Sequence, residues 1–177
     1  KIMSFPTNSD IDTLCKPYNI EINIAIENAG YIIAEWISDN AYYRKYIRNK
    51  IFNTGTITSK LKKNAVDENK TYEIYYDFNS PIKYMKSYRT LAINRGEKEK
   101  ILSVSLDYNK EELVNFLENK LIKNKESFVV EIVKNSILDS LKRLILPSIE
   151  REIRTEMTEI ADEKAINIFG INLENLL

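Results

Sequence analysis

The chain has 177 residues, 44% of them apolar, and its 26 basic residues are balanced by 26 acidic ones. This length suits one domain or one large lobe, and the neutral balance excludes the global positive field by which many nucleic-acid binders are recognised. Histidine is absent and Cys15 is the only cysteine, which excludes histidine-based catalysis, His-ligated or cysteine-rich metal sites, and internal disulfides.

The first part of the chain contains two competing patterns. Residues 1–19 carry two prolines with several Ser and Asn residues, and we interpret them as a tail or lead-in. Ile20, Ile22, Ile24 and Ile26 then alternate as in a strand. A helical pattern extends further, with apolar residues at Ile22, Ala25, Ile26, Ala29, Ile32, Ile33, Trp36 and Ile37. We predict a helix over residues 21–37, with Trp36 as a core anchor.

The next stretch predicts a second helix and a connection. Residues 38–40 can provide its N-cap, and Gly55 is placed to end it. Its basic residues are interpreted as a solvated face: Arg44, Lys45, Arg48 and Lys50. Residues 56–67 are polar and basic, and we expect a surface connection there. Aromatic residues between 72 and 78 predict a short helix that Asn79-Ser80-Pro81 breaks.

The second half predicts three helices and one strand before the C-terminal segment. Ser87 and Gly96 are placed as the N-cap and the end of a helix. Residues 101–106 alternate between apolar and polar side chains, as in a strand. A helix follows over 109–121, where Asn109 begins a pattern that resembles a capping box. Another helix covers 128–145 and ends before Pro147.

The C-terminal segment predicts one long helix over residues 149–176. Its apolar residues recur at three- and four-residue steps at Ile149, Ile153, Met157, Ile160, Ala161, Ala165, Ile168, Phe169, Leu173 and Leu176. If other helices bury that stripe, Phe169→Ala should cost about 3–5 kcal/mol. The expected fold class is therefore all-α: an elongated, mostly helical scaffold over residues 20–177, with one short strand near 101–106.

Three stretches, in this order, resemble the Tex proteins of bacteria. They are IENAGYIIAEWISDN with RKYIRNKIFNTGTITSK, then YEIYYDFNSPIKYMKSYRTLAINRGEKEKILSVSL, and last PSIEREIRTEMTEIADEKAINIFGINLENLL. Tex proteins are multidomain transcription accessory factors that bind nucleic acid. The last stretch is similar to their segment just before an RNase H-like domain. The resemblance covers residues 21–177.

The resemblance implies that the chain is a non-catalytic, cytoplasmic scaffold fragment without a cofactor. In that family, nucleic acid is bound chiefly by helix-hairpin-helix and OB-fold domains downstream of this segment, and the RNase H-like domain is thought not to be an active nuclease. Partners would be RNA or DNA and the transcription machinery. The alternative is a protein–protein interaction lobe without nucleic-acid affinity, which the neutral net charge favours. No apolar run approaches the roughly 20 residues of a membrane span.

One basic stretch with interleaved tyrosines is a candidate nucleic-acid site, because lysine and arginine bind phosphates and aromatic rings stack on bases. Its candidate contacts are Lys83, Lys86, Arg89, Arg95 and Lys98, with Tyr84 and Tyr88 between them. The alternative is that Tyr88 packs in the core while the arginines hold helix ends or carboxylates. We expect Arg95 at a helix C-terminus, and Arg89 paired with a carboxylate of the last helix.

The same stretch carries a Tex motif, S-H-R-x-L-A-x-x-R-G-E. The matching residues are Ser87, Arg89, Leu91, Ala92, Arg95, Gly96 and Glu97. Tyr88 stands where the family usually has histidine, so a contact that needs histidine is not carried over to this chain.

Paired carboxylates on the last helix suggest acid–base or metal chemistry, at Glu150 with Glu152, Glu156 with Glu159, and Asp162 with Glu163. We favour a solvated helix face with pairs such as Glu150–Arg154 at i, i+4. No nucleophile or second ligand set accompanies them. We therefore predict neither a catalytic site nor a metal site.

Overall fold

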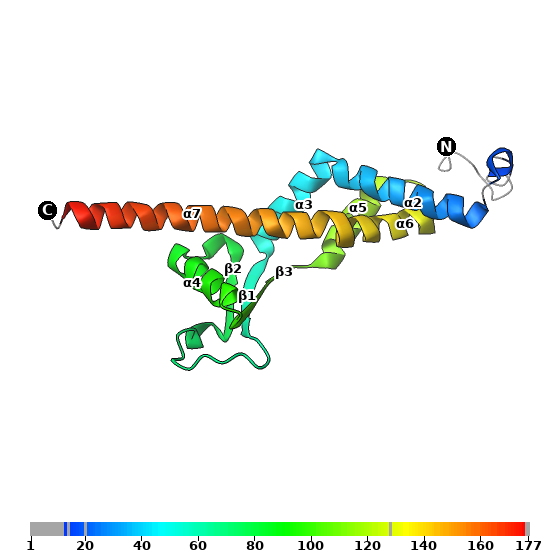
Figure 1. Cartoon of the computed structure of the whole chain (residues 1–177). Helices are drawn as coiled ribbons and strands as arrows, with labels where there is room; N and C mark the ends of the chain where they lie inside the picture. Colours follow the sequence, from blue (N-terminus) through cyan, green and yellow to red (C-terminus); the bar gives the residue numbers. More distant parts are fainter. Residues whose placement is uncertain (1–12, 14, 20, 128, 176–177) are drawn as a thin grey trace. The chain divides into compact units, whose positions relative to one another are not determined.

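The computed structural model describes residues 13, 15–19, 21–127 and 129–175. The chain forms two compact units, and each is built from two separate segments (Figure 1). The first unit comprises Lys1–Ile47 and Lys110–Ser148, and the second comprises Arg48–Asn109 and Ile149–Leu177. Helices dominate, which confirms the predicted mostly helical fold class.

Where the first unit is described, its regular structure is helical. Its elements are the short η2 (Lys16–Tyr18), α2 (Ile22–Asp39), the first half of α3 (Ala41–Thr54), α5 (Lys110–Leu121), α6 (Val130–Asp139) and the π-helix η5 (Ser140–Ile145). The helix predicted over 21–37 is confirmed as α2, and Ile20, which belonged to the competing strand pattern, lies outside the described residues. Asn40 caps α3 as predicted, since its Oδ1 accepts the backbone N–H groups of Tyr42 and Tyr43 at 3.0 and 3.1 Å.

The face of α2 that is buried differs from the predicted one. Gly30 lies against α6, where a Cβ atom would stand 3.5 Å from the Ser136 Oγ. This close approach turns Ala34 and Ile37 into the core and Trp36 outward, with 59% of its surface exposed. The prediction of Trp36 as a core anchor is therefore wrong, because the apolar pattern was wider than the face that α6 covers.

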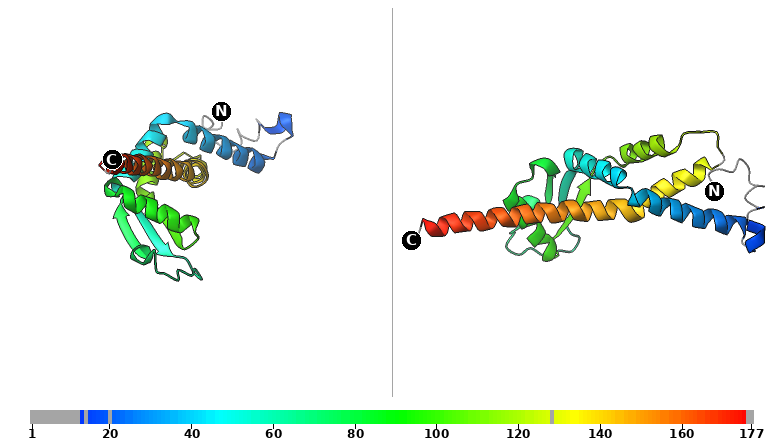
Figure 2. Two further views of the ribbon diagram at one scale, coloured as in Figure 1. Left: turned by 60° about the vertical axis from the view of Figure 1, so that its left-hand side comes forward. Right: turned by 90° about the horizontal axis from the view of Figure 1, so that it is seen from above.

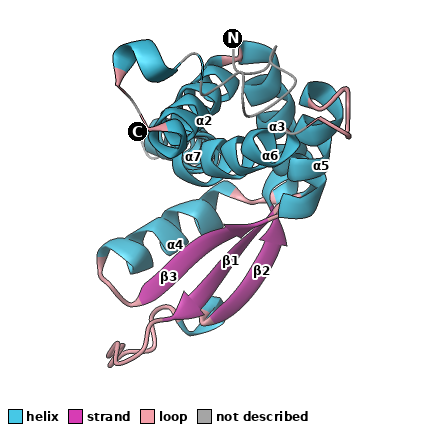
Figure 3. Cartoon of the chain, turned by 90° about the vertical axis from the view of Figure 1, so that its right-hand side faces the viewer, coloured by secondary structure: helices cyan, strands magenta, loops and turns pink. Residues whose placement is uncertain are grey.

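The second unit combines a small sheet with helices. It contains the end of α3, β1 (Thr56–Leu61), η3 (Glu73–Tyr75), β2 (Asp77–Pro81), η4 (Ile82–Tyr84), α4 (Ser87–Lys98), β3 (Leu102–Asp107) and most of α7 (Leu146–Glu174). The strand order is β2-β1-β3, and both pairs are antiparallel (Figure 3). The strand predicted at 101–106 is confirmed as β3. The prediction of a connection over 56–67 is wrong where β1 forms. The short helix predicted over 72–78 is reduced to the three-residue η3 and gives way to β2, so no helix passes through residues 79–81, as predicted.

The central strand β1 escaped prediction because its buried side chains are mostly polar. Ile57 is buried, but so are Thr58 and Ser59. Thr58 donates its hydroxyl to Asp107 Oδ2 at 2.9 Å, and Ser59 donates to the Tyr75 carbonyl at 2.9 Å. Hydroxyl groups that are hydrogen-bonded in this way can be buried at little cost. The strand therefore lacks the apolar alternation by which strands are recognised.

Helix α4 lies against one face of the sheet (Figure 3). Its Ile93 packs with Tyr72, Tyr75 and Leu102 in a buried cluster. Gly96 was predicted to end this helix, but the helix continues to Lys98. The glycine is needed for close packing, because a Cβ atom there would lie 2.6 Å from Leu102 Cδ1.

The start of α4 also differs from the prediction. Ser87 is the first helical residue and not the N-cap. Lys86 holds the N-cap position, and its side chain makes no capping hydrogen bond. The first turn of α4 holds no acidic residue, so no carboxylate offsets the positive end of the helix dipole there.

The predicted helix end before Pro147 is also wrong. Every residue from Val130 to Glu174 is helical, through α6, η5 and α7. Proline has no N–H and crowds the carbonyl four residues earlier. The wider π-helical turn of η5, in which the Leu146 N–H donates to the Leu141 carbonyl, lets the helical backbone pass this position without a break.

Helix α7 runs as one uninterrupted helix in Figure 2, and the burial of its side chains changes along its length. Ile149, Ile153 and Ala161 are buried, whereas every residue from 162 to 175 is exposed. Phe169 is 69% exposed, so the predicted burial of the stripe is wrong for its second half; Leu176 lies outside the described residues. In the described ranges, no helix has both the length and the apolar character that a membrane span requires.

Candidate nucleic-acid interface

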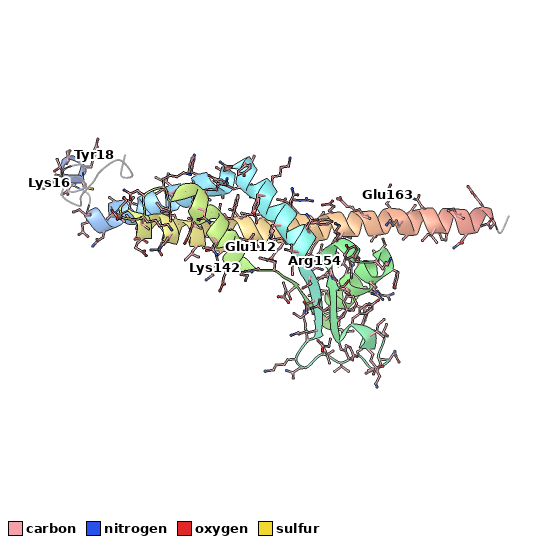
Figure 4. The ribbon with its side chains drawn as sticks, turned by 180° about the vertical axis from the view of Figure 1, so that it is seen from behind. Lys16, Tyr18, Glu112, Lys142, Arg154 and Glu163 are labelled. Atoms are coloured by element: carbon pink, nitrogen blue, oxygen red, sulfur yellow. The ribbon has the colours of Figure 1, made fainter. Side chains whose placement is uncertain are left out.

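Arg154 joins α7 to α4 inside the second unit. Its two terminal nitrogens donate to Glu97 at 3.1 and 2.6 Å, and one also donates to Asn94 Oδ1 at 3.0 Å. Asn94 in turn donates to Thr158 Oγ1 at 2.8 Å. Figure 4 shows Arg154 where α7 passes α4. This half-buried network holds the two helices in one register, since the two N–H···O bonds of an arginine–carboxylate pair are directional.

In the ion pair between these helices, the cation and the carboxylate come from the opposite helices to those predicted. We expected Arg89 of α4 to meet a carboxylate of the last helix, yet α4 supplies the carboxylate and α7 the arginine. Among the residues that the structure describes, Arg89 takes part in no ion pair. Its guanidinium lies 5.5 Å from the centre of the Phe78 ring and 5.6 Å from that of Tyr88, which is the distance of a cation–π contact.

A surface hollow of about 450 Å³ opens where η4 and the start of α4 meet α7. Its lining consists of three lysines, two tyrosines, a methionine and a serine: Lys83, Lys86, Lys164, Tyr84, Tyr88, Met85 and Ser87. The three lysines and both tyrosines are exposed. The alternative in which Tyr88 packs in the core is therefore wrong, because 63% of this side chain is exposed.

Local charge makes this hollow electropositive although the chain as a whole is neutral. Between Phe78 and Asn94 the sequence has three basic residues, Lys83, Lys86 and Arg89, and no Asp or Glu. The N-terminus of α4, which carries the positive end of the helix dipole, lies at the same place. Lys164 adds a further cation, and the residues three and four positions from it on α7 are Ile160, Ala161, Asn167 and Ile168. No carboxylate shares its helix face.

The other predicted contacts lie at the far end of α4, outside the lining of the hollow. Arg95 and Lys98 are in its last turn, as expected for Arg95. The Arg95 Nε donates to Glu99 at 3.0 Å, and the Tyr72 hydroxyl donates to the same carboxylate at 2.8 Å. These hydrogen bonds from Tyr72 and Arg95 lower the pKa of Glu99. The pKa of Tyr72 is raised by burial and then by its bond to Glu99.

The structure thus brings together Lys83 and Lys86, adds Lys164, and places Arg89 against the ring of Tyr88. Lys164 was not predicted. It follows Lys83 by about 80 positions in the chain and belongs to no motif that we recognised. Only the packing of α4 on α7 brings it to the hollow.

The carboxylates of α7 are structural where the structure gives them partners. The Tyr108 hydroxyl donates to Glu150. The pKa of Tyr108 is raised, chiefly by burial and to a smaller extent by this hydrogen bond. Arg48 donates to Glu156, so the prediction of a solvated Arg48 is wrong. Over the described ranges, no group of three or more Cys, Asp and Glu side chains could hold a metal ion.

Comparison with known proteins identifies the family. A family model described as Tex central region-like matches residues 19–169. The chain belongs to the Tex family. The uncharacterized protein YdcI of Bacillus subtilis is 50% identical over 154 residues, which cover 86% of this chain and 21% of that protein.

Two other relatives have more informative names. The S1 RNA-binding domain-containing protein 1 of Homo sapiens is 31% identical over 95% of this chain and 18% of its own length. The Transcriptional accessory protein Tex of Neisseria gonorrhoeae is 27% identical over 86% of this chain and 21% of its own length. The chain therefore spans about a fifth of the length of these relatives.

Proposed function

We propose that this chain is a non-catalytic, mostly helical scaffold of a cytoplasmic transcription accessory protein, and that it contributes a phosphate contact to nucleic-acid binding. The names of two relatives, Transcriptional accessory protein Tex and S1 RNA-binding domain-containing protein 1, support a role in transcription and in RNA binding. In this proposal the larger share of the affinity comes from other parts of the longer protein, and the transcription machinery is a partner of the whole.

The observation that carries the phosphate contact is the hollow with its three exposed lysines. Lysine ammonium groups that bind phosphates release condensed counterions, and this supplies most of the non-specific affinity for nucleic acid. Lys83 lies in η4, Lys86 at the N-cap of α4 and Lys164 on α7, and Arg154 holds α4 and α7 together. The three lysines can therefore surround one stretch of backbone without a rearrangement of the fold.

The test is a fluorescence anisotropy titration of a labelled 20-nucleotide RNA with the 177-residue chain, at several salt concentrations. The triple variant Lys83→Gln/Lys86→Gln/Lys164→Gln should bind about tenfold more weakly or worse at low salt. Its plot of log affinity against log salt should be shallower by about two units, since each lost contact with a single-stranded phosphate removes roughly 0.7. Because all three side chains are exposed, the thermal midpoint should not change.

A charge-matched variant controls for the loss of net charge. Lys45, Lys63 and Lys123 are exposed lysines outside the hollow, and their triple change to Gln should leave the salt slope nearly unchanged. Equal losses in both triple variants would mean that net charge, and not this hollow, supports binding, and the proposed contact would then be rejected.

A second candidate is a protein-binding lobe without nucleic-acid affinity. The observation in its favour is an apolar pair on α2, where Ile32 and Trp36 stand four residues apart and are 68% and 59% exposed. Exposed large apolar side chains that adjoin one another are typical of protein-binding surfaces. Complete absence of RNA binding by the wild-type chain at low salt would select this candidate.

A further inference from the structure

We propose that the hollow is a site for single-stranded nucleic acid, in which unpaired bases stack on Tyr84 and Tyr88 while the lysines hold the adjoining phosphates. This inference rests on the proposed phosphate contact and adds to it the kind of strand that is bound. The observation that supports the inference is the pair of aromatic rings, which a purely electrostatic site would not need.

The two tyrosines are unusual for this unit because they face solvent. Tyr72 and Tyr75 of the same unit are buried in its core, at 3% and 5% exposure. Tyr84 and Tyr88 are 69% and 63% exposed, and both line the hollow beside the lysines. Aromatic rings interleaved with cations along a groove are the arrangement by which proteins bind single strands without reading their sequence.

The backbone that carries these rings is held in place. Ile82, which begins η4, is buried, and its N–H donates to the Gly55 carbonyl at 3.0 Å. The Met85 N–H donates back to the Ile82 carbonyl at 3.2 Å. Tyr84 therefore extends from an anchored turn, which lowers the conformational entropy lost when a base stacks on its ring.

Arg89 orients the second ring. Its guanidinium, 5.6 Å from the centre of the Tyr88 ring, covers one face of it. A base would stack on the opposite face of the ring. The cation would then add a cation–π attraction to the stacked pair. Arg89, which we predicted as a phosphate or carboxylate contact, then acts as a positioning residue for Tyr88.

The volume of the hollow and the chemistry of its lining both fit an unstacked nucleotide. The volume of about 450 Å³ lies within the range of about 300–1,000 Å³ that is typical of small-molecule sites. In a duplex the faces of the bases are stacked on one another and cannot reach a protein ring. The lining contains no Asn, Gln, Asp or Glu, the side chains that read adenine and cytosine edges, so we expect no preference for adenine or cytosine.

The experiment compares strands of equal length with the full 177-residue chain. Labelled single-stranded DNA, single-stranded RNA and the corresponding DNA duplex, each of 20 nucleotides or base pairs, are titrated at the same set of salt concentrations. We expect tighter binding of both single strands than of the duplex. The variant Tyr84→Leu/Tyr88→Leu should lose about tenfold in single-strand affinity, which is within the range for the loss of stacking, while the salt slope and the duplex affinity stay unchanged.

Two control variants isolate the rings. Tyr84→Phe/Tyr88→Phe keeps the aromatic faces and should bind single strands as the wild type does. Tyr18→Leu removes a tyrosine that is 74% exposed in the first unit, and should also bind normally. Thermal midpoints of all variants verify that they are folded.

The outcomes separate this inference from the proposed function. Duplex binding as tight as single-strand binding, or unchanged single-strand affinity of the double leucine variant, would overturn the inference. If the triple lysine variant still showed its smaller salt slope, the phosphate contact would survive that result. If the lysine changes had no effect either, both proposals would fail.

Discussion

Ile153 and Phe169 lie on the same helix but in opposite environments. Ile153 has no exposed surface, whereas Phe169 is 69% exposed. Ile153→Ala should lower the free energy of unfolding by about 2–5 kcal/mol, through lost burial and a cavity. Phe169→Ala should change it by less than about 1 kcal/mol, in contrast to the cost of about 3–5 kcal/mol that we expected if other helices buried the stripe. Chemical denaturation followed by circular dichroism measures both, and similar losses in the two variants would contradict this.

Asp67 organises the loop between β1 and η3. Its carboxylate accepts the N–H groups of Thr71 and Tyr72 at 3.0 and 2.8 Å and the Tyr76 hydroxyl at 3.0 Å. Desolvation alone would raise the pKa of Asp67, but these hydrogen bonds outweigh it and lower the pKa below its ordinary value. The corresponding stability is present above the unfolded-state pKa of about 3.9 and is lost as pH falls through the lower folded-state pKa.

Asp67→Asn should therefore be less stable than the wild type at pH 7, since the amide nitrogen cannot accept these hydrogen bonds. The difference should shrink as the pH is lowered below about 4, where the unfolded wild-type carboxyl becomes protonated. Urea midpoints at pH 7, 5 and 3 measure this dependence. Glu68→Gln, at an exposed neighbouring carboxylate, serves as the control, and a constant difference at all three pH values would count against the assigned role of Asp67.

At the scale of elements, two helical glycines allow a matched comparison. At Gly96 of α4 a Cβ atom would lie 2.6 Å from Leu102 Cδ1, whereas at Gly170 of α7 nothing lies within 4 Å. Gly170→Ala should stabilise the protein by roughly 0.5–1 kcal/mol, because alanine loses less backbone entropy in a helix. Gly96→Ala should instead destabilise it by about 1–3 kcal/mol through overpacking. Thermal unfolding of both variants measures these changes. A stabilised Gly96→Ala protein would refute the close packing of α4 on β3.

The elements that could be predicted are those whose pattern comes from their own apolar residues. Helix α2 and strand β3 were predicted from such patterns, and their lengths came out within about two residues. β1 could not be found, because Thr58 and Ser59 are buried through hydrogen bonds to residues distant in sequence. The helical course through Pro147 was missed as well, since a π-helical turn leaves no periodicity in the sequence.

The candidate site also contains residues that could be predicted from the sequence and residues that could not. Lys83, Lys86 and the two tyrosines are neighbours in the chain, so their composition was enough to suggest a site. Lys164 reaches the hollow only through the packing of α7 on α4, a contact between distant segments that no local pattern encodes. The exposure of Trp36 is a similar case, because it depends on which side of α2 approaches α6.

At the scale of the whole molecule, the end of α7 contributes little to the folded core. Every residue from 162 to 175 is exposed, among them Ile166, Ile168, Phe169, Ile171 and Leu173. Removing residues 166–177 should therefore shift the thermal midpoint by less than about 4 °C, and Lys164 would be retained. The shortened chain should also self-associate less, because an exposed apolar surface is lost. A large loss of helical signal beyond the deleted residues, or a collapse of the thermal transition, would contradict this.

The exposure of the chain's one tryptophan determines what intrinsic fluorescence can report about this protein. Trp36 belongs to the first unit and is 59% exposed, so its emission should already be red-shifted in the native state and open to quenching by iodide. The second unit has no tryptophan at all, and its unfolding leaves no intrinsic signal of this kind. Tyr84→Trp would place an indole at the rim of the hollow, where a stacked base should quench its emission against the steady background of Trp36.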